Sequence, residues 1–405
     1  MELLAPAGGM ETLKTAVLYG ADAVYLGGDS YGLRAKAKNF GQEELAEAVA
    51  YAHAHHVKVH VTVNIIAHNE HLGGLEDYLR QLQAAGVDAL IMADAGMIDI
   101  ARRTVPDMEI HLSTQASATN YATFDFWHRM GVKRVVAARE VSLEEIAEIR
   151  RRVSPDLMIE AFCHGAMCIS ISGRCLLSSY LAGRDSNLGE CTHPCRWQYR
   201  LVEETRPGEY FPIAEGEEGT YIFNSKDLCM IEHLPEMEAA GIGSIKIEGR
   251  MKSPLYVAMA VKAYRKALDD LNKDPALYKA NLPLYKKWLD MASHRQETTG
   301  FYLGKPTQTD QVYEDSQYLR SADFVGVVLE PAGDGLFKVE QRGKFLRGDE
   351  LMVVPAKGDP VPFKADPLYD EAMQPIESAP HAKQILYMSL PISAEGCIVI
   401  RMKES

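Results

Sequence analysis

The sequence lacks the features of membrane and secreted proteins. No apolar run approaches the roughly 18 residues that a membrane-spanning helix requires, and the Met1–Pro6 segment has no basic residues ahead of an apolar stretch. The seven cysteines are an odd number, and a reducing compartment disfavours structural disulfides. We therefore expect a cytoplasmic protein without a signal peptide or a membrane anchor.

The chain also lacks an excess of basic residues and several catalytic motifs. Lysine and arginine number 43 against 56 acidic residues, a formal net charge of −13, so general affinity for nucleic acids is not expected, although a local basic patch could still bind RNA. No Gly-x-Gly-x-x-Gly follows the first expected strand, which disfavours a dinucleotide-binding fold. His-Glu-x-x-His is absent as well, which disfavours a zinc protease.

The first part of the chain alternates short apolar segments with amphipathic helical stretches. Several of these stretches end at a glycine, as is typical of a helix C-terminal cap. The alternation predicts parallel strands joined by crossover helices, and eight strands over about 250 residues favour an eight-stranded, TIM-like β/α barrel over a doubly wound sheet. The predicted strands are Glu2–Ala5, Ala23–Leu26, Val57–Asn64, Asp88–Ala93, Glu109–Ser113, Arg134–Ala137, Met158–Phe162 and Ser244–Glu248.

One connection of the predicted barrel is much longer than the others. The insertion, at about 163–240, separates the seventh and eighth strands and contains six of the seven cysteines. In a barrel this connection leaves the C-terminal face, where active sites lie. We predict a barrel over 1–295, a linker over 296–320 and, because short β runs and turn signals begin near Ser321, a small β-barrel-like domain over 321–405.

Five of the seven cysteines lie within the 33 residues from Cys163 to Cys195. Cys163 ends the seventh strand and Cys229 lies in a helical pattern, so both are predicted to be packed thiols. The spacing of the other four is neither the paired CxxC of a zinc ribbon nor a ferredoxin run, which leaves an iron–sulfur cluster, zinc or unligated thiols as readings. These four are Cys168, Cys175, Cys191 and Cys195.

Four segments of the chain indicate a family. They are Met1-Glu-Leu-Leu-Ala-Pro-Ala-Gly, Gly20-Ala-Asp-Ala-Val-Tyr, Ser113-Thr-Gln-Ala-Ser and the Glu160–Ser178 segment. These segments resemble peptidase family U32, also called collagenase-like. Within this family, the tRNA uridine hydroxylases share further segments with the chain. These are Gly189-Glu-Cys-Thr-His-Pro-Cys-Arg-Trp, Arg206-Pro-Gly-Glu-Tyr, Asn224-Ser-Lys-Asp-Leu and Lys246-Ile-Glu-Gly-Arg. The resemblance covers nearly the whole chain.

The resemblance implies an enzyme that installs a hydroxyl group at carbon 5 of a tRNA wobble uridine, with prephenate as the hydroxyl donor. It carries Cys168, Cys175, Cys191 and Cys195 over as ligands of a 4Fe-4S cluster, with zinc as the alternative metal. Related hydroxylases of ubiquinone synthesis use a later cysteine near Cys229 in place of Cys195. The implied partners are tRNA, prephenate and, as an option, a homologous second subunit.

Polar residues at the expected carboxyl ends of the strands are candidates for the site, because barrel enzymes place their active sites there. Two arginines suit a donor with two carboxylates, since guanidinium binds carboxylate bidentately. Structural ion pairing is the alternative for each residue. The candidate catalytic residues are Glu160, His111, Gln115 and Glu248, the candidate substrate-binding residues are Arg139, Lys246 and Arg250, and Asn64, Glu140 and His164 share the same expected position.

A basic strip with an aromatic residue lies beside the last two cysteines. Arg196 and Trp197, flanked by His193 and Arg200, could hold phosphates and stack a base. Tryptophan is more often a core residue than a stacking platform, so packing in the core is the favoured alternative for Trp197. Two other functions stay open from the residues alone: a peptidase, and a non-enzymatic RNA-binding protein stabilised by zinc.

Overall fold

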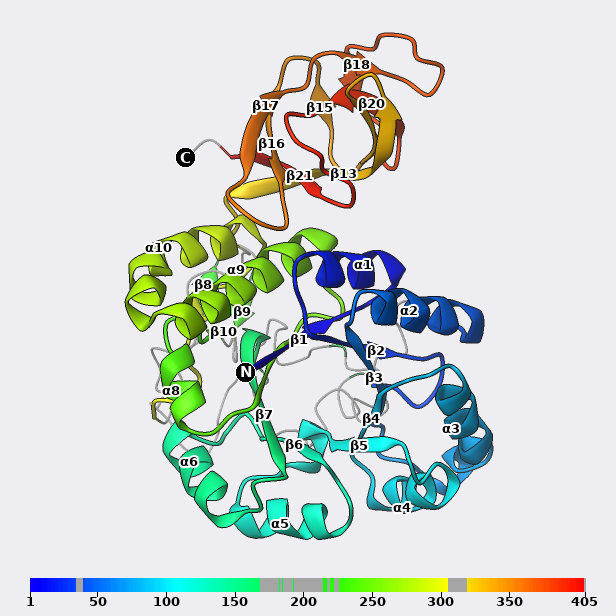
Figure 1. Ribbon diagram of the computed structural model, residues 1–405, viewed down its shortest axis with the longest axis vertical. Helices are drawn as coiled ribbons and strands as arrows, with labels where there is room; N and C mark the ends of the chain where they lie inside the picture. Colours follow the sequence, from blue (N-terminus) through cyan, green and yellow to red (C-terminus); the bar gives the residue numbers. More distant parts are fainter. Residues whose placement is uncertain are drawn as a thin grey trace. The chain divides into compact units, whose positions relative to one another are not determined.

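The computed structural model (Figure 1) describes residues 1–33, 39–167, 226–304 and 319–403, and a few residues between 168 and 225. It divides the chain into two compact units. The first consists of Met1–Met10, Asp22–Met251 and His294–Tyr318, and the second of Glu11–Ala21, Lys252–Ser293 and Leu319–Ser405.

Eight parallel strands in the first unit form a closed barrel (Figure 1). Each strand pairs with the next one along the chain, and the eighth pairs with both the seventh and the first, which closes the barrel. The predicted barrel and all eight predicted strands are thus confirmed. The strands are β1 (Glu2–Pro6), β2 (Ala23–Gly27), β3 (Lys58–Val63), β4 (Ala89–Met92), β5 (Glu109–Leu112), β6 (Arg134–Val136), β7 (Met158–Ala166) and β11 (Ser244–Ile247).

Helices connect the strands and lie outside the barrel (Figure 1). Their apolar faces supply buried leucine, isoleucine and methionine side chains, as the amphipathic pattern predicts. Ser142 begins α6 with a capping box shared with Glu145. The expected glycine caps are confirmed, since Gly86, Gly131 and Gly241 all have positive φ. The helices of this unit are α2 (Gln42–Ala54), α3 (Leu75–Ala84), α4 (Ala95–Thr104), α5 (Tyr121–Arg129), α6 (Leu143–Arg152) and α8 (Leu234–Ala239).

The connection from β7 to β11 contains short strands besides α8. Strand β10 (Asp227–Cys229) pairs antiparallel with the end of β7 and parallel with β12 (Glu297–Thr298). Strand β12 lies within the predicted linker. The helical pattern expected around Cys229 is therefore wrong: pairing with β7 imposes an extended backbone on these residues. A hairpin of β8 (Ala214–Gly216) and β9 (Gly219–Tyr221) lies earlier in the connection.

The second unit combines three helices with an antiparallel sheet. The helices are α1 (Met10–Leu18), α9 (Pro254–Lys273) and α10 (Pro275–Met291). The buried Lys262 of α9 donates to the carbonyl oxygens of Pro355, Ala356 and Gly358. The sheet confirms the expected small all-β region. Its seven strands are β13 (Ala322–Gly333), β14 (Leu336–Gln341), β16 (Glu350–Val354), β17 (Val361–Lys364), β18 (Leu368–Tyr369), β20 (Ile385–Ser389) and β21 (Ile398–Met402), and a separate pair is β15 (Phe345–Leu346) with β19 (Ser378–Ala379).

No helix among the described residues is long and apolar enough to cross a membrane.

Candidate active site

A network of buried charges occupies the barrel interior at the starts of the strands. Arg134 on β6 lies 2.6 Å from Glu2 Oε1 and 2.8 Å from Glu160 Oε2, and its second terminal nitrogen is 3.1 Å from Glu2 Oε2. Ser244 on β11 accepts from Arg134 and donates to Glu2 at 3.0 Å. These residues come from four strands that the closed barrel makes neighbours. We call Glu2, Arg134, Glu160, Ser244 and Lys246 the interior network.

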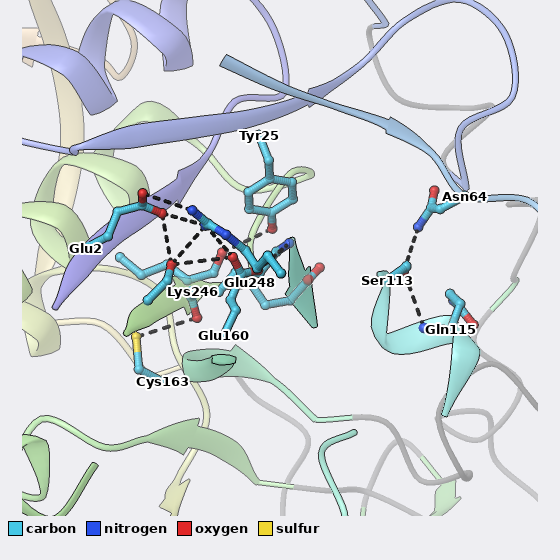
Figure 2. Close-up of polar contacts among 12 residues, drawn as sticks. Glu2, Tyr25, Asn64, Ser113, Gln115, Glu160, Cys163, Lys246 and Glu248 are labelled. Atoms are coloured by element: carbon cyan, nitrogen blue, oxygen red, sulfur yellow. Dashed lines mark hydrogen bonds and ion pairs between the residues drawn. The ribbon is translucent and has the colours of Figure 1, made fainter. Parts of the chain in front are cut away.

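Lys246 joins this network from β11 (Figure 2). Its ammonium lies 3.2 Å from Glu160 Oε1 and 4.2 Å from the centre of the Tyr25 ring. The Glu160 side chain is 1% exposed. Burial alone would raise the pKa of Glu160, but Lys246 and Arg134 overcome that effect and hold it at about 2. The network therefore keeps Glu160 ionised in the protein interior, where an unpaired carboxylate would be costly.

His111 lies in the same interior, beside His60 of β3. The two rings meet edge to face at 4.7 Å, and His111 Nε2 lies 3.1 Å from Glu109 Oε1. Burial lowers the pKa of both histidines, for His111 against the opposing hydrogen bond to Glu109. Burial therefore favours the neutral form of both rings.

The candidates that follow β6 and β11 lie instead at the barrel mouth, by which we mean the C-terminal ends of the strands. Arg139 Nη2 is 3.6 Å from Glu248 Oε2, and the side chains of Arg139 and Glu248 are 16% and 17% exposed. The Arg139 guanidinium also stacks over the Phe162 ring at 4.0 Å. This ion pair is longer and more open to solvent than the pairs of the interior network.

Arg250 is buried in the mouth by residues that the sequence did not single out. Its Nη1 donates to Thr62 Oγ1 at 2.7 Å, and Nη2 makes a longer contact of 3.5 Å with Asn39 Oδ1. Gly27 lies so close that a β-carbon there would come within 2.8 Å of the guanidinium, and one at Gly8 would come within 2.0 Å of the Arg250 carbonyl oxygen. Gly8 belongs to a segment of the family resemblance, but no motif marks Gly27, Asn39 or Thr62, which come from β2, the chain after β2, and β3.

Three further polar residues lie together at the ends of β3 and β5 (Figure 2). The Asn64 amide donates to Ser113 Oγ at 3.3 Å, and the backbone N–H of Gln115 donates to the same hydroxyl at 3.3 Å. Gln115 donates to Ser113 through its backbone N–H, so this hydrogen bond does not occupy its side-chain amide.

The cysteines fall into two groups. Cys163, Cys229 and Cys397 are buried and form no disulfide, and Cys163 Sγ lies 3.5 Å from the Lys246 carbonyl oxygen. Within the part of the chain that the structure describes, no group of three or more His, Cys, Asp or Glu side chains could hold a metal ion. The four predicted ligands Cys168, Cys175, Cys191 and Cys195, and the strip residues His193, Arg196, Trp197 and Arg200, lie outside the described residues.

One Gly-x-Ser-x-Gly pattern, Gly28–Gly32, also occurs and raises the question of a serine nucleophile. Ser30 lies in an exposed bend after β2. Among the described residues no hydrogen bond joins it to a histidine, so the structure gives it no activating base.

The described elements thus combine a barrel, a long insertion between β7 and β11, and a separate antiparallel β region. A model of peptidase family U32 matches residues 8–312, and a model of the family's C-terminal domain matches residues 320–401. The chain belongs to peptidase family U32.

Relatives in this family match most of the chain. It is 43% identical to tRNA hydroxylation protein P1 of Bacillus subtilis, over 96% of this chain and 92% of that protein. It is 38% identical to tRNA hydroxylation protein P of Escherichia coli, over 97% and 94% of the two chains. An uncharacterized protease of Methanocaldococcus jannaschii is 42% identical over 75% of this chain and 73% of its own.

Proposed function

We propose that this U32 protein hydroxylates RNA, and specifically carbon 5 of a tRNA wobble uridine. The names of the two bacterial relatives support RNA hydroxylation, because the match extends over more than nine-tenths of each chain. The choice of carbon 5 and of the wobble uridine rests on the resemblance of the cysteine-bearing segments to the tRNA uridine hydroxylases.

The geometry that best supports this function is the pair of arginines at the barrel mouth. Arg139 follows β6 and Arg250 follows β11, each three residues after its strand ends. Planar guanidinium groups in a partly dehydrated mouth suit a small dicarboxylate. We propose prephenate as this molecule, with Arg139 and Arg250 each binding one carboxylate.

The net reaction constrains what the donor must do. Replacing C5–H by C5–OH adds one oxygen atom to the base and oxidises it by two electrons. A donor that supplies this oxygen from its own hydroxyl group therefore accepts the two electrons and leaves with hydrogen in place of that hydroxyl. Of the four candidate catalytic residues, Glu248 and Gln115 lie at the carboxyl ends of strands and remain the proposed catalytic residues, whereas His111 and Glu160 are buried in the interior and are proposed to support the barrel. Glu248 lies at the mouth beside Arg139, whereas Glu160 lies inside the barrel.

The proposed cofactor is a 4Fe-4S cluster on Cys168, Cys175, Cys191 and Cys195. Thiolate sulfur is the donor that such clusters require, and the bound cluster would supply a redox centre. Protein purified without oxygen should be brown and contain about four iron and four sulfide per chain. Colourless protein with stoichiometric zinc would contradict the cluster.

Single substitutions assign the ligands. Replacing any of the four cysteines by Ala should abolish iron retention, and Cys397→Ala, in the second unit, is the matched control that should keep it. Cys229 competes with Cys195 for the fourth position, and Cys229 is buried in β10. Iron retained by Cys195→Ala and lost by Cys229→Ala would reassign that ligand.

The nucleosides of tRNA test the function itself. A strain lacking the gene should lose the modifications derived from 5-hydroxyuridine, and the wild-type gene should restore them. An unchanged nucleoside profile, together with cleavage of gelatin or collagen by the pure protein, would support a peptidase instead. RNA binding with bound zinc and no change in the nucleosides would support a non-enzymatic role.

A further inference from the structure

We propose that Thr62 and Gly27 are positioning residues that fix the guanidinium of Arg250 for carboxylate recognition. This inference rests on the proposed function, since it assigns the donor's carboxylate to Arg250. Neither residue was a candidate from the sequence. Gly27 on β2 and Thr62 on β3 are register partners, so both contacts with the Arg250 guanidinium come from one pair of neighbouring strands.

The Thr62 hydroxyl has a defined orientation. It donates to the Leu26 carbonyl oxygen at 3.1 Å and accepts from Arg250 Nη1 at 2.7 Å. Because a hydroxyl has a single proton, donation to the backbone leaves its lone pairs directed at the arginine. The hydrogen bond to the backbone of β2 thus orients the Thr62 hydroxyl, and the hydroxyl in turn fixes Nη1 of Arg250.

Gly27 provides the space for the same guanidinium. A β-carbon at position 27 would lie 2.8, 2.9 and 3.0 Å from Nη1, Nη2 and Cζ of Arg250. These atoms form the far end of a flexible side chain, so alanine there should displace the guanidinium without disturbing the barrel. Gly27 is not in a left-handed conformation, and its backbone therefore accepts alanine.

Gly8 shows the contrasting case. A β-carbon at Gly8 would lie 2.0 Å from the backbone carbonyl oxygen of Arg250, which cannot move away as a side chain can. Gly8→Ala should therefore destabilise the protein. Alanine at Gly27 should impair recognition while the fold stays intact.

The experiment compares three substitutions in full-length protein purified without oxygen. Thr62→Val removes the hydroxyl at nearly constant shape, Thr62→Ser keeps it, and Gly27→Ala fills the space. Gly73→Ala is the matched glycine control, because a β-carbon there meets no atom within 4 Å. The measurements are the Kd of prephenate by calorimetry, the KM values of prephenate and tRNA, and the melting temperature.

We expect Thr62→Val and Gly27→Ala to raise the Kd and KM of prephenate by about ten- to hundred-fold. The KM of tRNA and the melting temperature should stay near the wild-type values, and Thr62→Ser and Gly73→Ala should bind like wild type. A purely structural role would instead lower the melting temperature without separating the two KM values. If Thr62→Val fails to fold, the Kd of prephenate for Gly27→Ala tests the inference by itself.

Wild-type Kd values in both Thr62→Val and Gly27→Ala would overturn the inference, as would a wild-type protein that does not bind prephenate. Failure of the proposed function has a different signature. In that case wild-type protein binds prephenate but forms no hydroxylated nucleoside, and the binding data still decide the roles of Thr62 and Gly27.

Discussion

The interior network and the barrel mouth use the same side chains, arginine and glutamate, in different surroundings. In the interior network Arg134 and Glu160 are 4% and 1% exposed and lie 2.8 Å apart. At the mouth Arg139 and Glu248 are 16% and 17% exposed and lie 3.6 Å apart. Charges that satisfy each other in the interior stabilise the barrel, whereas loosely paired charges at the mouth can exchange partners with a substrate. Burial and pairing, rather than residue type, separate structural from functional charges here.

The largest expected effect comes from breaking the interior network. Arg134→Ala leaves Glu2 and Glu160 without their shared cation in a buried site, and we expect it to lower the free energy of unfolding by about 3–5 kcal/mol. Urea denaturation measures this loss. Arg129→Ala is the control, because among the described residues Arg129 makes only an exposed pair with Asp125 on the same helix. A loss below about 1 kcal/mol in Arg134→Ala would show that the network does not support the barrel.

The acid dependence of stability comes next. A carboxyl group whose pKa is lower in the folded than in the unfolded protein stabilises the fold above its unfolded pKa, and this contribution disappears as the pH falls through its folded pKa. For Glu160 the window runs from its ordinary pKa of 4.5 to about 2. We expect the stability gap between wild type and Glu160→Gln to shrink by roughly 3 kcal/mol across this window. A gap that is constant from pH 6 to 2 would refute the assignment.

At the mouth, substitutions should change donor use more than stability. Arg139→Lys and Arg250→Lys keep the charge but lose the planar fork, so each should weaken prephenate binding by about ten- to hundred-fold. Iron content should be unchanged, since neither residue is a proposed ligand. If both variants restore full tRNA hydroxylation in a deletion strain, the two arginines serve the barrel structure and the carboxylate pocket must be sought in the His193–Arg200 strip.

The smallest expected effect is the stability change in Glu248→Gln. The pair with Arg139 is long and partly exposed, and such pairs contribute about 1 kcal/mol or less. Thermal unfolding of the variant should therefore resemble that of wild type. A loss as large as that of Arg134→Ala would abolish the distinction between the two regions.

The barrel was predictable because its signal is local. Each strand is a short apolar run followed by an amphipathic helix, and the glycines at 86, 131 and 241 mark the helix ends. The pattern failed at Cys229, where pairing with β7 overrides the helical spacing. Local periodicity contains no information about such a long-range partner.

The candidate site was predictable only in part. Strand ends identified Arg139, Glu248 and Arg250, but the same reasoning grouped Glu160 and Lys246 with them, although both lie within the barrel. Closing the barrel brings Glu2 and Ser244 against Arg134, and sequence spacing does not reveal that contact. Thr62 and Gly27 were missed because a threonine and a glycine in a strand carry no signal until the arginine is placed beside them.

The most direct test makes one chemical change in both regions, Arg134→Lys and Arg250→Lys. Prephenate affinity and the free energy of unfolding are then measured on each variant and on wild type. If the interior network is structural and the mouth binds the donor, Arg134→Lys lowers stability while any folded fraction binds prephenate normally, and Arg250→Lys weakens binding by about ten-fold or more at near wild-type stability. Equal losses of stability and binding in the two variants would contradict this account.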